Sequence, residues 1–510
     1  MHIYRSLLLS CLVVGPGCKR TDSSPTRGAV TETSNRPEIT HGVAIGDVSA
    51  THVILWARGD RPAQLHAQLT SAGAGTHRGQ VAVAAESDFT GQVVLTGLQP
   101  DTAYQYAVWL SPDSDTPGED TQAPDNAFKG AVKTAPAADH ARPVRLAWGG
   151  DLAGQNMCRD RERGFAIFEH MPAAEFDLFI ALGDMIYADN ACLERGHLGN
   201  EQIPGPGKAV ELDDFWNKWK YARDDRGYRD FLAQVPTFAV WDDHEVVNDF
   251  GPTSDTRDTA PYSAGVHLMP AGLRAFIDYN AITPDSSSPG DTQRLYRRAR
   301  WGKHLELFFL DTRQYRADNA ALDTGPTPKS MLGDEQRTWL VRSLTESTAT
   351  WKLVVSSVPM AIPTGDPESS ARDGWANFNH DTGFERELLA ILRELQKAGQ
   401  NRTVWLTTDV HFATGFRYRP FADAEPFQVH EFVSGPLNAG LFPSRDLDPT
   451  LGGERLFFHG PDTPESVTSY DDALGWMNVG TLAIDADGTM TVGIVNGRGE
   501  TVFTTTLQPT

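Results

Sequence analysis

The sequence predicts an α/β protein in which a small β-sandwich domain precedes a larger, layered α/β sandwich domain. Three observations support this prediction. Residues 41–135 contain short alternating apolar stretches separated by Gly, Asp and Pro, a pattern typical of a β-sandwich. Residues 143–510 alternate short continuous apolar runs with stretches of helical spacing, which indicates βα units around a buried sheet. Four of those apolar runs end in Asp or His, so we expect a functional site at one edge of the sheet.

The chain begins with a predicted signal peptide at residues 1–18. A basic start precedes the apolar run Leu7 to Val14, which is too short to span a membrane. Gly15-Pro16-Gly17-Cys18 resembles a bacterial lipoprotein cleavage site, so we expect a lipid on Cys18, with ordinary secretion as the alternative. Residues 19–40 are rich in Ser, Thr, Arg and Pro and read as a flexible tether. We therefore expect an exported bacterial protein, periplasmic or anchored in the outer membrane, that contacts a membrane only through Cys18.

The composition is that of a folded, acidic protein. Hydrophobic residues make up 40% of the 510 residues, enough for a sizeable core. The formal net charge of −22 argues against binding of nucleic acid through bulk electrostatics. Outside the signal peptide the cysteines are Cys158 and Cys192. An exported protein can form disulfides, so these two either pair with each other or leave Cys158 as a metal thiolate.

The first domain is expected to contain strands and no catalytic residues. The stretch from Leu98 to Tyr104 resembles the tyrosine corner of fibronectin-like domains. The domain is either a spacer or one wall of a substrate cleft. The expected strands are 43–47, 52–57, 65–69, 92–95 and 103–109.

The second domain is expected to contain three helical stretches, at 213–234, 334–344 and 385–395, whose aromatic and leucine side chains belong to the core. Strands 305–310 and 351–356 lie between them, and a β meander over 480–503 ends the domain. The stretch 437–472 is rich in Pro and Gly. We expect it to cover the site and to set specificity.

Four apolar strands in this domain deliver acids or imidazoles at their carboxyl ends. Carboxylate oxygens and imidazole nitrogens bind cations such as Fe, Mn, Zn and Ca, and a bridging carboxylate lets two metals share one water. The sequence therefore predicts a metal site at this edge of the sheet. The strands end at Asp151, at Gly183-Asp184, at Asp242-Asp243-His244-Glu245 and at Asp409-Val410-His411.

These blocks carry a family resemblance. The stretch from Gly183 to Asp189 resembles the purple acid phosphatase block in which Asp bridges two metals and Tyr, three residues on, binds iron. Asp243-His244-Glu245 resembles the Asn-His-Glu/Asp block of calcineurin-like metallophosphoesterases, with Asp in place of Asn. Asp409-Val410-His411 resembles their His-x-His block, with Asp in place of the first His. Together with Leu310-Asp311-Thr312-Arg313, the pattern is similar to that of the alkaline phosphatase D (PhoD-like) family.

The resemblance implies a metallophosphoesterase fold, made of a pair of mixed sheets flanked by helices, and a role for each residue. His244 would be the general acid that protonates the leaving group. The metals would be Fe(III), which suits a tyrosine phenolate, and a divalent ion, preferably Ca, with Zn or Mn as alternatives. The first metal would be held by Asp151, Asp184, Tyr187 and His411, and the second by Asp184, Asp243 and Asp409.

Some assignments stay open. Asp242 is the alternative to Asp243 as a ligand, and Asn248 at most supports one. Arg313 and Arg223 either form internal ion pairs or bind phosphate. Two positions depart from the family pattern. Many relatives carry Cys where this chain has Asp151, and no strong ligand stands near Ser356-Ser357, where the middle His of the calcineurin-like enzymes aligns.

The expected function is metal-dependent hydrolysis of small phosphate esters, as an alkaline phosphatase acting on monoesters, diesters or both. A phospholipase-like phosphodiesterase is one alternative. A surface-tethered lipoprotein that binds Ca or phosphate without turnover is another. The proton donor His244 beside a full set of carboxylates favours an enzyme, because binding alone needs no acid there.

Overall fold

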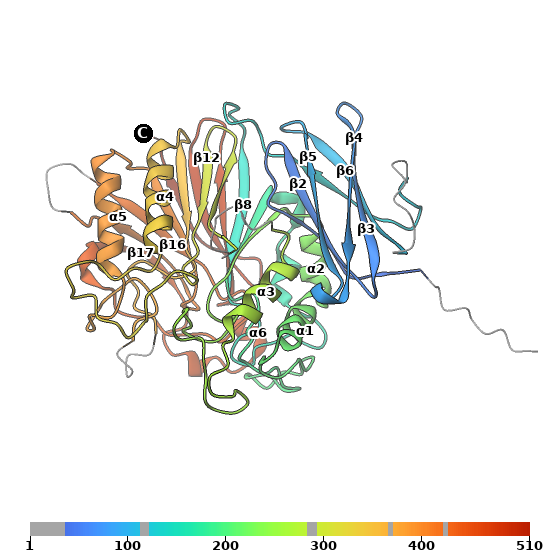
Figure 1. Cartoon of the computed structure of the whole chain (residues 1–510). Helices are drawn as coiled ribbons and strands as arrows, with labels where there is room; N and C mark the ends of the chain where they lie inside the picture. Colours follow the sequence, from blue (N-terminus) through green and yellow to red (C-terminus); the bar gives the residue numbers. More distant parts are fainter. Residues whose placement is uncertain (1–35, 113–121, 283–292, 366–370, 422–426, 510) are drawn as a thin grey trace, which may run out of the picture. The chain divides into compact units, whose positions relative to one another are not determined.

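The computed structural model describes residues 36–112, 122–282, 293–365, 371–421 and 427–509. The predicted signal peptide and most of the predicted tether lie outside these residues. Three sheets organise the chain from residue 36 onward (Figure 1). Among the described residues, no helix is both long enough and apolar enough to cross a membrane.

The nine-stranded sheet has the order β20-β19-β18-β8-β9-β10-β1-β2-β5. Its centre, β8 to β10, is parallel, as continuous apolar runs predict. The predicted terminal meander is confirmed, since β18, β19 and β20 pair antiparallel at one edge. The strands span β1 Ile39–Gly46, β2 His52–Gly59, β5 Thr90–Thr96, β8 Val144–Gly149, β9 Leu178–Leu182, β10 Thr237–Val240, β18 Asn478–Ile484, β19 Met490–Asn496 and β20 Thr501–Leu507.

The seven-stranded sheet has the order β11-β12-β13-β14-β16-β15-β17 and faces the nine-stranded sheet across a shared core. Phe238 of the first sheet stacks on Phe309 of the second, with ring centroids 5.2 Å apart. Strands β12, β13, β14 and β16 are parallel neighbours. The strands span β11 Arg297–Trp301, β12 Leu305–Phe309, β13 Trp351–Val355, β14 Thr403–Thr407, β15 Ala413–Tyr418, β16 Val429–Val433 and β17 Gly453–His459.

The four-stranded sheet, β4-β3-β6-β7, is antiparallel and packs on β2 and β5 to form the predicted β-sandwich. Its Tyr104 is buried and its hydroxyl accepts a hydrogen bond from the Gln99 N–H at 3.0 Å, as a tyrosine corner requires. Strands β1, β2 and β5 also extend the nine-stranded sheet, so the domain boundaries 41–135 and 143–510 stay predictions. The strands span β3 Ala63–Ser71, β4 Gly75–Val83, β6 Ala103–Pro112 and β7 Phe128–Lys133.

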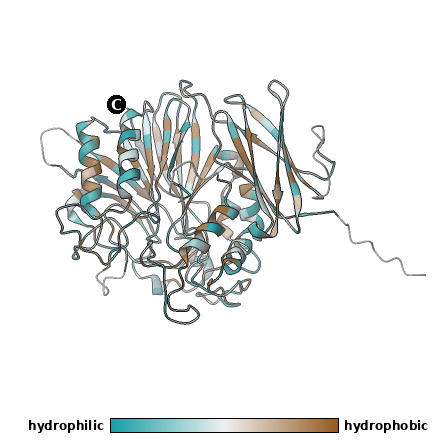
Figure 2. Ribbon diagram, viewed as in Figure 1, coloured by the Kyte–Doolittle hydropathy of each residue, from teal (hydrophilic) through white to brown (hydrophobic). Residues whose placement is uncertain are grey.

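Helices cover the two outer faces, which confirms the layered sandwich. Helices α1 to α3 pack on the nine-stranded sheet, and α4 and α5 pack on the seven-stranded sheet (Figure 1). These helices turn their hydrophilic residues outward (Figure 2). The α-helices span α1 Leu212–Arg223, α2 Arg226–Leu232, α3 Met269–Tyr279, α4 Gly333–Glu346, α5 Glu385–Lys397 and α6 Tyr470–Ala473. The 3-10 helices span η1 Ala85–Ser87, η2 Ala166–His170, η3 Ala173–Glu175, η4 Pro449–Leu451 and η5 Pro464–Ser466.

The predicted helical stretch 213–234 is helical in two pieces, α1 and α2. The second helix starts after Asp225, whose side chain accepts a hydrogen bond from the Tyr228 N–H as its N-cap. The aromatic residues Phe215, Trp219 and Phe231 are buried as predicted.

Candidate metal centre

Residues from three of the four predicted strand ends, those of β9, β10 and β14, line one cavity of about 320 Å³, whereas Asp151 at the end of β8 does not line it. Strands β8, β9 and β10 approach it side by side from the nine-stranded sheet, and β14 approaches from the facing sheet. The described lining residues are Gln155, Asp184, Asp243, His244, Asn248, Asp249, Thr364, Gly365, Asp409, Val410, His411, Phe442 and Arg445.

The backbone turns into the left-handed region at four of the predicted ligands. Asp151, Asp184, Asp409 and His411 have φ values of +62°, +52°, +79° and +57°. This conformation costs a non-glycine residue about 1–3 kcal/mol, and such strain concentrates at functional sites. The chain adopts this strained conformation directly after strands β8, β9 and β14.

Tyr187, His411 and Asp151 form one group of donors beside the cavity. The Tyr187 hydroxyl lies 2.9 Å from His411 Nε2 and 3.4 Å from Asp151 Oδ1, and His411 Nε2 lies 3.4 Å from the same oxygen. The His411 Nδ1 contacts the Gly440 carbonyl oxygen, which leaves Nε2 for a ligand on this side. The Thr408 hydroxyl donates to the other oxygen of Asp151.

Asp184, Asp243 and His244 form a second group, with one possible ligand atom from each within 4.8 Å of the others. Asp243 Oδ1 and Asp409 Oδ2 are buried and have no hydrogen-bond partner among the described residues. Buried carboxylate oxygens without partners are costly in an apolar interior unless a cation compensates them. The donor set and these oxygens therefore fit bound metal ions.

The electrostatics agree with this fit. Burial, together with Asp243 and Asp242, raises the pKa of the Asp184 carboxyl well above its usual range. Burial and the same two neighbours raise the pKa of Asp409 in the same direction. Carboxylates gathered this closely ionise together only when a positive charge lies among them.

His244 is held by Asp189. Its Nδ1 lies 2.7 Å from Asp189 Oδ1, and its ring centroid lies 4.1 Å from that of Tyr187. Burial lowers the pKa of His244, but the charges of Asp189 and Asp243 outweigh it and raise the pKa to about 10. Asp189 is fixed in turn by the Asn248 N–H, 3.0 Å from its Oδ2. The imidazole is therefore kept protonated, with Nδ1 engaged.

Two comparisons decide the family. The model of the PhoD-like phosphatase family matches residues 146–491, and the model of the PhoD-like phosphatase N-terminal domain matches residues 23–136. The chain belongs to the PhoD-like phosphatase family.

Individual relatives agree. Alkaline phosphatase D of Bacillus subtilis (strain 168) is 27% identical over 266 residues, which cover 50% of this chain and 44% of that protein. The match thus spans less than half of the curated relative. The solved structure of PhoD has a TM-score of 0.67 at 21% identity and covers 92% of this chain and 93% of that one. A purple acid phosphatase from yellow lupin seeds has a TM-score of 0.59 at 10% identity, covering 92% and 74%. These structures share the fold of this PhoD-like phosphatase.

Adjacent residues Asp242 and Asp243 have different environments. Asp243 lines the cavity, whereas Asp242 is fully buried behind it, with its Oδ1 accepting from Arg313 and from Ser357 at 2.8 Å. Arg313 also binds Asp373 through two hydrogen bonds of 2.7 Å. The structure thus places Arg313 in a buried internal ion pair, one of the two alternatives, and away from the cavity lining.

Arg223 is not part of this site. It is buried under the nine-stranded sheet, with its guanidinium carbon 4.4 Å from the Trp56 ring centroid and a hydrogen bond to the Tyr279 carbonyl. Of the two alternatives for Arg223, an internal ion pair or phosphate binding, its position favours an internal role, because helix α1 directs it into the core and it does not line the cavity. Asn248 does line the cavity, and its backbone holds Asp189.

Sequence reasoning missed several residues of the site. Glu245 accepts backbone hydrogen bonds from Asp184, Met185 and Asp242 at 3.0, 2.8 and 2.8 Å, which fixes two ligand loops to each other. Its place directly after His244 was the available signal. Asp189 follows Asp184 in the same loop, but its contact with His244 spans 55 residues and leaves no local pattern.

Cys158 and Cys192 form a disulfide, which excludes Cys158 as a metal thiolate. The bond joins the segment after β8 to the segment after β9. These segments carry Asp151 and Asp184, so the disulfide braces two of the predicted ligand loops against each other.

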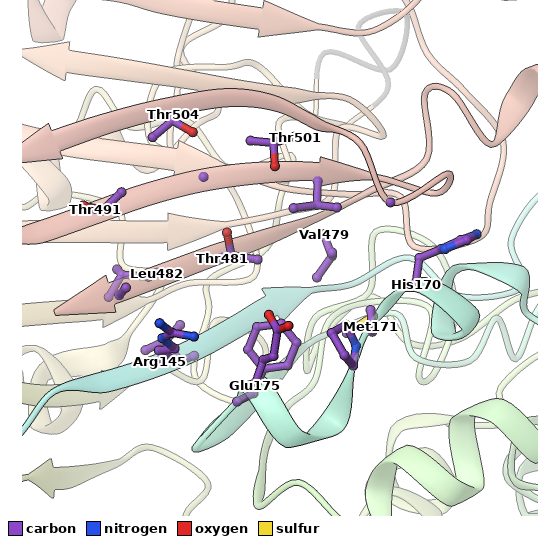
Figure 3. A pocket seen from close by; sticks show the side chains of 17 residues that line it. Arg145, His170, Met171, Glu175, Val479, Thr481, Leu482, Thr491, Thr501 and Thr504 are labelled. Atoms are coloured by element: carbon purple, nitrogen blue, oxygen red, sulfur yellow. The ribbon is translucent and has the colours of Figure 1, made fainter. Parts of the chain in front are cut away.

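A second hollow, of about 450 Å³, lies elsewhere in this PhoD-like phosphatase. Figure 3 shows Arg145, Thr481, Thr491 and Thr504 on the strands that line it, together with Glu175 from η3. None of the predicted ligands lines it, and no cluster of possible metal ligands among the described residues lies there. The chemistry therefore belongs to the smaller cavity.

Proposed function

We propose that this PhoD-like phosphatase hydrolyses phosphate esters at the cavity between its two sheets, with two metal ions and His244 as general acid. The observation that supports the proposal best is the gathering of the Asp184 and Asp243 carboxylates and the His244 imidazole within 4.8 Å of one another, with the buried Asp409 Oδ2 left without a hydrogen-bond partner among the described residues. Family membership supports the reaction class. The choice between monoester and diester, the mechanism and the metals are our proposal.

Two sets of side chains would hold the metals. Asp151, Asp184, Tyr187 and His411 suit Fe(III), and the all-carboxylate set of Asp184, Asp243 and Asp409 suits Ca more than Zn or Mn. When bound, the two ions would supply a water of lowered pKa and neutralise charge on the phosphoryl group. Burial and Asp184 raise the pKa of Tyr187 well above its usual range, so its phenolate forms only next to a cation.

His244 would transfer the proton. Asp189 occupies Nδ1 at 2.7 Å, so Nε2 carries the proton available to the leaving oxygen. The Tyr187 ring, tilted by 30° against the imidazole, and the hydrogen bond from the His244 backbone N–H to Asp184 Oδ1, at 3.1 Å, fix His244 relative to the predicted ligands. A fixed acid beside the reacting phosphate is what ester cleavage needs.

We also propose that the protein is exported and anchored through a lipid on Cys18. Its sequence signal supports this location, and the disulfide between Cys158 and Cys192 is consistent with an oxidising compartment.

The test is hydrolysis of phenyl phosphate, 4-nitrophenyl phosphate and bis(4-nitrophenyl) phosphate by protein purified without chelator, with elemental analysis of the same sample. We expect about two metals per chain. His244→Ala should keep the metals but lower kcat by about 10²–10⁴ on phenyl phosphate, whose leaving group needs a proton, and less on 4-nitrophenyl phosphate. The exposed His170→Ala is the matched control and should change nothing. Tight metal binding without turnover on any ester would favour the binding lipoprotein instead.

A further inference from the structure

The segment between β16 and η4 forms one wall of the cavity with two side chains, Phe442 and Arg445. Phe442 stacks on the His411 ring, with centroids 4.3 Å apart and planes at 9°. Since His411 is a predicted ligand, this contact fixes the wall relative to the metal centre. Arg445 follows Phe442 by three residues in the same segment.

Arg445 is the only Lys or Arg among the described residues that line the cavity. Its carbonyl oxygen accepts from the Arg455 guanidinium at 2.9 Å, and its own Nη1 donates to the Pro363 carbonyl at 2.9 Å. These two bonds hold both ends of the residue in place.

Among the described residues, no carboxylate pairs with the Arg445 guanidinium. A guanidinium has five N–H donors, and within the described part of the chain Arg445 donates one hydrogen bond, to a neutral carbonyl. By contrast, the Arg313 and Arg316 side chains are buried and both form ion pairs with Asp373. As far as the described residues go, Arg445 therefore presents a positive charge without a paired carboxylate, and further N–H donors, at the wall of the cavity.

We propose that Arg445 is a specificity residue that binds a second anionic group on the substrate, so that the enzyme prefers phosphate esters whose alcohol part carries a further phosphate or carboxylate. The inference rests on the proposed function of the same cavity. The reacting phosphate would bind beside the acidic residues, where the metals would neutralise its negative charge. Arg445, on the wall of the cavity, is then left to bind a different anion. A planar guanidinium suits a phosphate or carboxylate because it donates two parallel hydrogen bonds.

The test compares two esters with the metal-loaded enzyme, propane-1,3-diol bisphosphate and 3-hydroxypropyl phosphate, whose short flexible chains differ only in the second anion. The readout is the ratio of their kcat/KM values. Arg445→Gln should lower this ratio about tenfold, mainly through KM for the bisphosphate, because a charge-assisted hydrogen bond is lost. Arg445→Lys, which keeps the charge but not the planar donor pair, should give an intermediate ratio.

The exposed Arg342→Gln on α4 makes the same change in net charge and should leave both constants unchanged. Equal melting temperatures of the variants confirm folding. If the wild type hydrolyses both esters and the ratio is unaltered in Arg445→Gln, the inference is overturned. If the wild type hydrolyses neither ester, the proposed function fails instead.

Discussion

The contact between His244 and Asp189 gives a quantitative prediction about pH. Asp189→Asn removes the charge 2.7 Å from Nδ1 that does most to raise the pKa of His244 to about 10. Losing a neighbouring opposite charge shifts a pKa by about 1–3 units, so we take the His244 pKa in the variant as about 8. His244 acts as an acid, and so activity is present below this pKa and is lost as pH rises through it.

The size of the effect follows from these values. At pH 9 the protonated fraction of His244 falls from about nine tenths with a pKa of about 10 to about one tenth with a pKa of about 8, and kcat falls about tenfold. At pH 6 His244 is protonated in both the wild type and the variant, so their kcat values should differ little.

The assay is the pH profile of kcat on phenyl phosphate between pH 5 and about 11, with metal content measured at each end. The exposed Asp213→Asn, on α1, changes net charge equally and serves as the control. If the alkaline limb of Asp189→Asn coincides with that of the wild type while metals and fold are retained, His244 is not the acid or Asp189 does not set its pKa.

Three further predictions concern stability and metals. Removal of the metals with a chelator should abolish turnover and lower the melting temperature, because the clustered carboxylates lose their compensating charge, and added Fe with Ca should restore both. Replacing Cys158 and Cys192 with Ser should lower the free energy of unfolding by about 3 kcal/mol in urea titrations, since a cross-link across 34 residues is lost. Arg313→Gln should lower it by about 3–5 kcal/mol, because Asp242 is left buried without a counter-charge and Asp373 keeps only Arg316, and a loss below about 1 kcal/mol would contradict that reasoning.

Local signals in the sequence were enough to predict the layers and to single out the candidate metal ligands. A buried parallel strand is a continuous apolar run, and its carboxyl end lies at the same edge as its neighbours' ends, so Asp151, Asp184, Asp243 and Asp409 were foreseeable as one group. The helices α4 and α5 followed from apolar residues at helical spacing. Even the break between α1 and α2 had a local cause, since Asp225 is an N-cap residue.

The tertiary structure decided what depends on partners far along the chain. Asp242 and Asp243 are chemically alike, and only Arg313, 71 residues from Asp242, assigns one to an ion pair and leaves the other to the cavity. In the same way Asp189 reaches His244 across 55 residues. Arg445 enters the wall because Phe442 packs on His411. Strand periodicity reports which face a residue occupies but not which distant side chain meets it. This is why the sequence by itself could single out the candidate ligands, while only the fold decided which partners those residues have.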